Sequence, residues 1–302
     1  MKRIKSILWF MICLAGVLLI GFLGYVYFIY SSFKNTVDEV IQVPVQHVVK
    51  ENRVINADSN GEKPFSLLLL GIDERENDRG RSDVIIVITV NPRQKTAHMF
   101  NIPRDTRTAI IGKGIDDKIN HAYAYGGVNM AVQTVEKFLD IPIDYYVQVN
   151  MEGFQQVIDL FGGVTVDVPF TFGYEGFTFA KGGMELNGAA ALAYSTMRYQ
   201  DPEGDRGRNK RQQQIIRALA KKAATMSTMT KAEDLKQFLI SHVRTNLTWD
   251  QIRYMQEIYK SLNTLDTVTI KGTGTYIKGV YYYIIPEKER AELAALIKKD
   301  LE

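Results

Sequence analysis

Phe65-Ser-Leu-Leu-Leu-Leu-Gly71 and Asp83-Val-Ile-Ile-Val-Ile-Thr-Val-Asn91 are the two stretches of sequence that decide the fold. Each is an almost continuous apolar run of strand length, which is the pattern of a β-strand buried on both faces. A third strand is expected at residues 96–102, and apolar residues recur at helical spacing over residues 128–139. Because strands and helices then alternate, we predict an α/β fold with a central sheet that is covered on both faces.

The same alternation continues to the C-terminus. Gly162-Gly163, for example, separates a predicted helix from the strand that follows it. Further strands are expected at residues 145–149, 164–168, 268–270 and 280–285, with a hairpin over residues 170–179. Further helices are expected at residues 151–161, 186–197, 209–226, 232–243 and 249–262, and from Pro286 onward. The predicted globular domain therefore fills residues 65–302.

The N-terminus carries a long apolar segment. Residues 7–30 are uncharged and would form ~36 Å of helix at ~1.5 Å per residue, enough to span a hydrocarbon core of ~30 Å. No A-x-A-like cleavage site follows, so we predict a retained transmembrane anchor. Lys2, Arg3 and Lys5 precede it, and the positive-inside rule leaves residues 1–6 in the cytoplasm. We expect a single-pass (type II) protein of the cell membrane, with a stalk or linker at residues 31–64 and the domain outside.

Composition and topology exclude several classes of function. The 302 residues are 46% apolar and carry a net charge of +3, so the chain can build a core and has no strong overall charge. Cys13 is the only cysteine, which rules out an intramolecular disulfide and argues against a cysteine nucleophile. A domain outside the membrane has no access to ATP or to nucleic acid. We therefore expect no nucleic-acid partner, and an enzyme whose substrate carries its own energy.

Asp73 and Asp83 bracket the loop between the first two predicted strands. Asp73 follows the first strand and Asp83 begins the second, so both carboxylates could converge on one point. Loops at strand ends are where α/β folds hold ligands. One or two aspartates, together with phosphate oxygens and water, are the ligands that Mg²⁺ prefers. We predict a Mg²⁺ site here; a solvated loop in which an aspartate caps the turn is the alternative.

Arginines are concentrated in two other loops. Four of them lie within residues 197–211, and Arg104 follows the third strand. A guanidinium group binds phosphate oxygens through two parallel hydrogen bonds and does not lose its proton. Beside an acidic metal loop, these arginines indicate a bound diphosphate. The alternative is that they form structural salt bridges with the aspartates of the same loops.

A series of short motifs, in this order, resembles the LytR-CpsA-Psr family. The matching segments lie within residues 65–225 and are Leu70-Gly-Ile-Asp-Glu-Arg75, Arg81-Ser-Asp83, Asn101-Ile-Pro-Arg-Asp-Thr106, Lys118-Ile-Asn-His-Ala-Tyr123, Gly126-Gly127, Gly162-Gly-Val-Thr-Val-Asp-Val168, Leu186-Asn-Gly-Ala-Ala-Ala-Leu-Ala-Tyr194, and Gly204-Asp-Arg-Gly-Arg208 with Arg211-Gln212. The short N-terminus, the single anchor and the C-terminal segment are similar to those of the members that attach wall teichoic acid.

The resemblance implies a fold, a reaction and a set of site residues. The fold would be a three-layer α/β/α sandwich with a central mixed sheet and a tunnel for an undecaprenyl chain. The reaction would transfer an anionic glycopolymer such as wall teichoic acid from undecaprenyl diphosphate to the C6 hydroxyl of N-acetylmuramic acid in peptidoglycan. Mg²⁺, or Mn²⁺ in its place, would lie near Asp73 and Asp83. The arginines implied around the diphosphate are Arg75, Arg81, Arg104, Arg107, Arg198, Arg206, Arg208 and Arg211.

Asp83, Arg104 and Asp105 are the candidate catalytic residues. Phosphoryl transfer needs positioning and charge neutralisation more than a covalent intermediate, and Arg104 would stabilise the charge on the diphosphate. Either Asp83 or Asp105 would accept the proton of the hydroxyl group, and the sequence does not choose between them. Two other functions compete with this one. They are a polyprenyl-diphosphate hydrolase with the same groups, and a non-catalytic regulator of the cell wall that binds lipid-linked precursors.

One position departs from the family pattern. Many members carry Arg-x-Arg after the Leu-Ala-Tyr helix, whereas this chain has Thr196 at the first arginine position and Arg198 at the second. Arg206 is the candidate to compensate for the missing arginine. We therefore expect weaker binding of the diphosphate unless Arg206 supplies the charge.

Overall fold

The structure is a computed structural model that describes residues 24–47, 63–74, 79–225 and 232–302. The predicted transmembrane anchor at residues 7–30 falls mostly outside the described residues, as does the part of the predicted stalk at residues 48–62. Within the described ranges, no helix combines the length and the apolar character needed to cross a bilayer.

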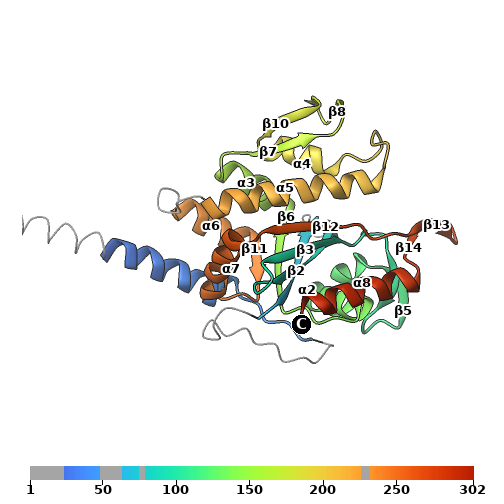
Figure 1. Cartoon of the computed structure of the whole chain (residues 1–302), viewed down its shortest axis with the longest axis horizontal. Helices are drawn as coiled ribbons and strands as arrows, with labels where there is room; N and C mark the ends of the chain where they lie inside the picture. Colours follow the sequence, from blue (N-terminus) through green and yellow to red (C-terminus); the bar gives the residue numbers. More distant parts are fainter. Residues whose placement is uncertain (1–23, 48–62, 75–78, 226–231) are drawn as a thin grey trace, which may run out of the picture.

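A six-stranded mixed sheet forms the centre of the domain (Figure 1). Its strand order is β11-β6-β1-β2-β3-β12. Neighbours pair antiparallel except for β6 with β1 and β12 with β3, which are parallel. The bounds are Phe65–Ile72 for β1, Ser82–Asn91 for β2, Thr96–Asn101 for β3, Tyr145–Asn150 for β6, Val243–Thr245 for β11 and Thr264–Val268 for β12. The prediction of an α/β fold with a central mixed sheet is confirmed.

Two helices cover one face of the sheet, namely α2 (His121–Leu139) and α8 (Glu287–Asp300). Alternate residues of β1, Leu68, Leu70 and Ile72, point to this face because side chains alternate along a strand. They pack with apolar residues of both helices in the main core, and each is at most 2% exposed. This face of the sheet is therefore closed, and the site must lie on the other one.

The opposite face is covered unevenly. α7 (Trp249–Ser261) packs directly on one end of it, where Phe65 and Ile258 share a cluster. The rest faces a layer built from α3, α4 and α5 (Figure 1), whose core is separate and includes Tyr194 and Ile215. The bounds are Met151–Leu160 for α3, Gly188–Thr196 for α4, Asp205–Thr225 for α5 and Ala232–His242 for α6. The apolar core of the α3–α5 layer does not merge with the clusters that pack on the sheet.

Four small two-stranded sheets complete the domain. The pairs are β4 (Arg107–Ile110) with β5 (Ile115–Lys118), β7 (Val164–Val168) with β10 (Gly182–Leu186), β8 (Phe172–Tyr174) with β9 (Phe177–Phe179), and β13 (Thr273–Ile277) with β14 (Val280–Ile284). The hairpin predicted at residues 170–179 is confirmed as β8 and β9. The strand predicted at residues 268–270 instead lies at Thr264–Val268, because an edge strand with mostly solvated side chains pairs with β3 there.

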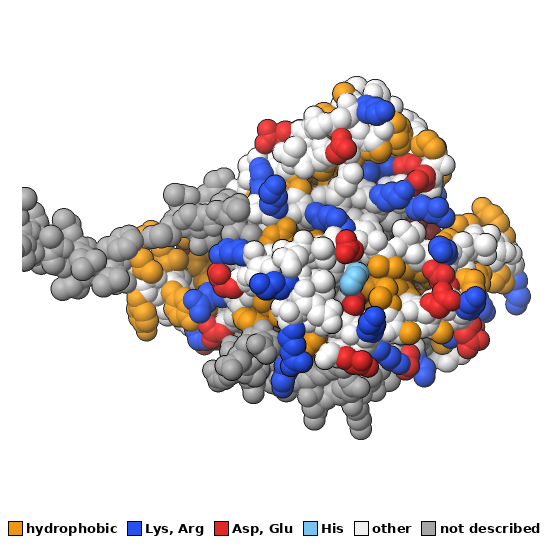
Figure 2. All heavy atoms as spheres, viewed as in Figure 1, with side chains coloured by type: hydrophobic (Ala, Val, Ile, Leu, Met, Phe, Trp, Pro, Cys, Tyr) orange, Lys and Arg blue, Asp and Glu red, His pale blue; other side chains and the backbone are white. Residues whose placement is uncertain are grey.

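The N-terminal helix packs against the domain instead of standing apart from it. Residues 24–35 are helical and continue into a π-helical turn, η1 (Thr36–Ile41). Phe33 stacks on Trp249 with ring centroids 5.3 Å apart, and Lys34 Nζ donates to Asp250 Oδ2 at 3.1 Å. The sequence predicted a stalk from residue 31, but Val37 and Ile41 are fully buried. Apolar side chains on the outer part of this helix face solvent (Figure 2).

Candidate active site

A β-bulge places Asp83 at the start of β2. The pairing of β1 with β2 shifts after Gly71, so that Gly71 faces Val84 while Ile72 faces Ser82. Asp83 is therefore the extra residue, and a bulge of this kind turns a side chain away from the regular alternation. A Cβ on Gly71 would lie 2.9 Å from Val84 Cβ, so the close approach of the strands here requires glycine. Bulge and glycine together direct Asp83 toward the open face.

Asp73 lies at the same end of the two strands. Its backbone N–H donates to Arg81 O at 3.0 Å, and the backbone N–H of Asp83 donates to the same oxygen at 3.0 Å. The sequence-based expectation that the two aspartates meet at one strand end thus agrees with the backbone. Arg75, in the loop between them, lies outside the described residues. Arg81 is exposed and does not line the cavity described below.

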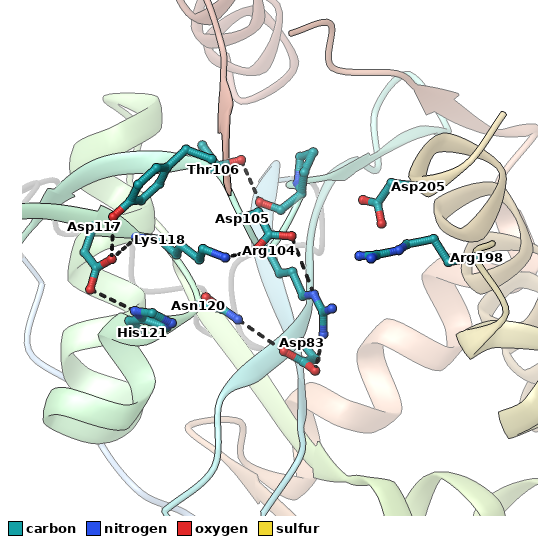
Figure 3. Close-up of polar contacts among 12 residues, drawn as sticks. Asp83, Arg104, Asp105, Thr106, Asp117, Lys118, Asn120, His121, Arg198 and Asp205 are labelled. Atoms are coloured by element: carbon teal, nitrogen blue, oxygen red, sulfur yellow. Dashed lines mark hydrogen bonds and ion pairs between the residues drawn. The ribbon is translucent and has the colours of Figure 1, made fainter. Parts of the chain in front are cut away.

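Arg104 and Asn120 hold the Asp83 carboxylate (Figure 3). Arg104 Nη1 lies 2.5 Å from Asp83 Oδ2, and Asn120 Nδ2 donates to Asp83 Oδ1 at 3.2 Å. Arg104 lies in the turn after β3, where the backbone N–H of Thr106 donates to Pro103 O at 2.9 Å. Asn120 sits directly before α2 and is buried, with its own Oδ1 atom unpartnered. The carboxylate is thus fixed from two elements that the sequence separates by many residues.

Asp105 belongs to an adjoining ion-pair network. Its Oδ1 lies 2.7 Å from Lys118 Nζ, and its Oδ2 lies 3.8 Å from Arg104 Nε (Figure 3). Beyond it, His121 Nδ1 lies 2.8 Å from Asp117 Oδ2, so this histidine takes part in a hydrogen bond at the edge of the network. Arg104 therefore bridges two aspartates, Asp83 on the cavity side and Asp105 on the outer side.

Arg198 and Arg208 approach Asp83 and Arg104 from the opposite layer. Arg198 follows the C-terminus of α4, and its side chain points toward Arg104 (Figure 3). Arg208 lies in the first turn of α5 and is only 6% exposed, with Nη2 2.8 Å from Asp205 Oδ1. Its Nε atom is buried and has no hydrogen-bond partner among the described residues. Burial lowers the pKa of Arg208, although Asp205 opposes this effect and Arg104 and Arg198 reinforce it.

These residues form the polar end of a cavity of about 410 Å³ between the sheet and α5. Most of the wall is apolar; it is built by Leu69, Val147, Val149, Phe154, Val157, Leu192, Ile215, Ile216 and Leu219. On α5 the lining runs from Arg208 to Leu219, which is ~16 Å at ~1.5 Å per residue. The cavity is thus an apolar channel that ends at three arginines and one aspartate.

Arg211 organises the loop that carries the other arginines. It is 1% exposed, donates from Nε to Tyr194 O at 2.8 Å, and donates to Asp201 and to Met197 O. Its guanidinium also lies 5.6 Å from the ring centroids of Phe172 and Tyr194. These contacts tie α5 to the segment after α4. The structure therefore places Arg211 in the interior, outside the cavity lining, where it positions its neighbours.

Arg107 and Arg206 lie outside the apolar cavity, whereas Thr196, which replaces an arginine of the family pattern, lines it. Arg107 is in β4 and pairs with Asp116 at 3.0 Å. Arg206 lines a second cavity on the other side of the first turns of α5. Thr196 does line the apolar cavity, and its Oγ1 donates to Leu192 O at 2.8 Å. An arginine at position 196 would therefore reach the same space as Arg198 and Arg208.

Lys118 and Asn120 are site residues that the sequence reasoning did not assign a role. Both occur in the segment Lys118-Ile-Asn-His121, which is one of the motifs that resemble the LytR-CpsA-Psr family. The signal that could have found them is that a lysine and an amide directly precede a helix whose N-terminus faces the arginine-bearing loop.

Comparison with known proteins places the chain in a family. The family model described as LytR_cpsA_psr matches residues 44–299, and the chain therefore belongs to the LytR-CpsA-Psr family. A relative from Bacillus subtilis (strain 168), the polyisoprenyl-teichoic acid–peptidoglycan teichoic acid transferase TagU, is 43% identical over 302 residues, covering 100% of this chain and 98% of that protein. The transferase of the same name from Bacillus cereus (strain AH820) is 46% identical over 300 residues, covering 99% and 98%.

Solved structures agree with this assignment. The crystal structure of B. subtilis TagU has a TM-score of 0.67 and 45% identity, and the match covers 80% of this chain and 98% of that one. The structure of TagT bound to LIIa-WTA has a TM-score of 0.73 and 31% identity, and the match covers 86% and 99%.

Proposed function

We propose that this protein transfers a teichoic acid from a polyisoprenyl diphosphate carrier to peptidoglycan. Relatives that are 43% and 46% identical along nearly the whole chain are named as transferases of this kind. We further propose that the carrier is undecaprenyl diphosphate and that the acceptor is the C6 hydroxyl of N-acetylmuramic acid.

The proposal rests on the wall of the cavity, which is apolar along most of its length and lined by three arginines at one end. An apolar channel suits a hydrocarbon chain, because burying apolar surface contributes roughly 25 cal/mol per Å². The three arginines at its end suit a diphosphate, because guanidinium groups pair with phosphate oxygens. A soluble nucleotide would gain nothing from the apolar wall, whereas a lipid-linked diphosphate matches both parts.

The reaction would be a substitution at phosphorus. The acceptor hydroxyl oxygen forms a bond to the phosphorus that carries the polymer, and the bond from that phosphorus to the oxygen of polyisoprenyl phosphate breaks. Arg104, Arg198 and Arg208 would stabilise the negative charge that develops on the leaving phosphate. The product is a phosphodiester, and the hydroxyl proton passes to a base.

Asp83 is the base that we favour. It lines the cavity, whereas Asp105 lies outside the lining. A general base must come within hydrogen-bond reach of the proton that it accepts. The location of Asp83 at the arginine end satisfies this requirement more directly than that of Asp105.

Asp83 and Asp73 are also the residues that we propose for binding Mg²⁺, with Mn²⁺ as a substitute. Each oxygen of Asp83 accepts one hydrogen bond, from Arg104 or from Asn120, and a carboxylate has about four acceptor positions in all. The residues present therefore leave room for a cation. Across the described residues, no three His, Cys, Asp or Glu side chains cluster, so a bound cation would need further ligands from phosphate and water. When bound, the cation would neutralise diphosphate charge.

We propose that residues 7–30 span the cell membrane and that the domain faces outward. Support comes from the basic residues that precede this segment and from the exposed aromatic residues at its described end, such as Tyr27 and Phe28. A lipid-linked donor would then reach the enzyme within the same bilayer.

A reconstituted reaction tests the function. The full chain in detergent or in lipid nanodiscs would receive a synthetic polyisoprenyl-diphosphate glycan donor, Mg²⁺ and a peptidoglycan glycan acceptor. Mass spectrometry should find a conjugate joined by a phosphodiester, and Arg198→Ala should reduce its yield, whereas Arg253→Ala on the outer surface of α7 should not. Release of free polymer phosphate alone would instead support the hydrolase. Donor binding without any product would support the non-catalytic binding protein.

A further inference from the structure

A second cavity lies beside the arginine end of the first. It has a volume of about 430 Å³ and lies between the first turns of α5 and the segment around β12 and β14. In contrast to the apolar channel, its wall is largely polar and includes Asn209, Gln213 and Arg206. None of these residues belongs to the cavity already described. The polymer-transfer chemistry derived above makes no use of this space.

Gln213 is the residue that points to a ligand. Its side chain lines the second cavity, is only 5% exposed, and has no hydrogen-bond partner among the residues that the structure describes. The glutamines on either side of it are satisfied. Gln212 Oε1 accepts from Asn101 at 3.1 Å, and Gln214 Oε1 accepts from the Tyr194 hydroxyl at 2.7 Å. Its amide atoms are not among the fully buried unpartnered atoms of the described residues, so they are open to the cavity and available to a polar ligand that enters it.

Tyrosines of the β13–β14 hairpin form the other side of the cavity. Tyr281 and Tyr283 both line it, and Tyr281 is 37% exposed. The Tyr276 ring packs edge-on against Tyr281 with centroids 5.5 Å apart, which holds the Tyr281 ring in place. Figure 2 shows apolar side chains gathered where Figure 1 places this hairpin. Flat apolar rings opposite amide side chains suit a sugar, which has C–H faces for the rings and hydroxyl or acetamido groups for the amides.

The two cavities adjoin at the reacting end. Asn101 lines the second cavity and bonds to Gln212, which lines the first. Asp205 lines the second cavity and pairs with Arg208 of the first. In a substitution at phosphorus, the attacking and leaving oxygens lie roughly in line on opposite sides. If the lipid occupies the apolar channel, the second cavity is an adjoining space from which the attacking hydroxyl could reach the arginine end.

We propose that the second cavity binds a sugar of the acceptor glycan, with Gln213 and Tyr281 as its main contacts. This proposal rests on the proposed function, because it takes the acceptor to be peptidoglycan. The sugars next to the diphosphate of the donor are the other possible source of the same chemistry. We take the acceptor as the occupant, because the attacking hydroxyl must approach from outside the channel that would hold the lipid.

The test compares Gln213→Ala and Tyr281→Ala with Gln237→Ala, a matched glutamine on α6 that bonds only to Glu233 of its own helix. The full chain in detergent would be titrated with a short synthetic peptidoglycan glycan that carries no lipid. Separately, KM would be measured for this acceptor and for the lipid-linked donor. We expect both cavity variants to raise the glycan Kd and the acceptor KM about fivefold to tenfold, as for one lost hydrogen bond or ring contact. The donor KM and the Gln237→Ala values should stay at those of the unaltered protein.

Two results would overturn the proposal. One is unchanged glycan binding in both variants, and the other is a rise in donor KM alone, which would assign the cavity to the donor sugars. Tyr281 is at the surface, so its variant stays informative if Gln213→Ala lowers Tm. The proposed function can fail independently. If the unaltered protein forms no conjugate but binds the glycan through these two residues, the transfer reaction is wrong and the cavity assignment stands.

Discussion

Arg208→Ala is the substitution whose effect the structure defines best. The side chain is 6% exposed at the end of the apolar channel, so solvent weakens its interaction with a phosphate very little. Its unpartnered Nε atom is a donor that the protein itself leaves unused. A hydrogen bond between charged groups contributes about 1.5–3 kcal/mol. Because ~1.4 kcal/mol corresponds to a factor of ten, kcat/KM for the lipid-linked donor should fall by about one to two decades.

Two comparisons separate this effect from a general loss of structure. Arg208→Lys keeps the charge but lacks the guanidinium fork, so it should recover only part of the activity. Arg217→Ala removes an arginine of the same helix whose side chain contacts Thr267 and lines neither cavity, so it should leave kcat/KM unchanged. The assay is conjugate formation with the lipid-linked donor varied at a fixed acceptor concentration, with Tm measured for each variant. If Arg208→Ala stays within twofold of the unaltered protein at an unchanged Tm, Arg208 does not contact the diphosphate.

Three further predictions concern the metal, the missing arginine and a histidine. Asp83→Asn should abolish Mg²⁺-dependent turnover, and a Mg²⁺ titration of the variant with normal activation would remove Asp83 from the metal site. Thr196→Arg should tighten donor binding about tenfold in the parent and equally in an Arg206→Ala background, because Arg206 faces the other cavity. If binding tightens only in the Arg206→Ala background, positions 196 and 206 share one site. The hydrogen bond to Glu136 raises the pKa of His47 above 6.5 despite partial burial. Protonated His47 therefore stabilises the folded state fully below about pH 6.5, and this stabilisation is lost as pH rises through the higher pKa of the folded state. The Tm of His47→Gln should therefore differ most from that of the parent at low pH, and a constant difference across pH 5–9 would contradict this linkage.

The sequence predicted the parts of the fold that are buried on both faces. β1 and β2 are continuous apolar runs because helices cover one side and the cavity and α7 lie on the other. Short strands such as β4 and β5 have exposed polar residues, so nothing in their composition separates them from loops. β12 was placed a few residues too late for the same reason.

Only some of the residues that the sequence predicts for the site lie together in the structure. Asp83, Arg104, Arg198 and Arg208 do converge, because strand ends and helix starts meet at one edge of the layers. Arg206 and Arg208 separate because residues two apart on an α-helix differ by about 200° in direction, so they face different cavities. Arg211 cannot be distinguished from a ligand-binding arginine by sequence, because only the folded chain brings Asp201 and the carbonyl oxygens of Tyr194 and Met197 around it.

The packing of residues 24–41 against α7 and α6 has a consequence for where the enzyme can work. A flexible tether would let the domain turn and reach outward, whereas Trp249 and Asp250 hold the helix of residues 24–35, and with it the outer end of the proposed membrane segment, against the domain. If that segment spans the membrane as proposed, both cavities stay at a constant height above the bilayer. Lipid-linked donors would then arrive by diffusion in two dimensions, and only glycan strands that pass at this height could receive a polymer. Attachment would be confined to the innermost layer of the wall, whatever the length of the polymer.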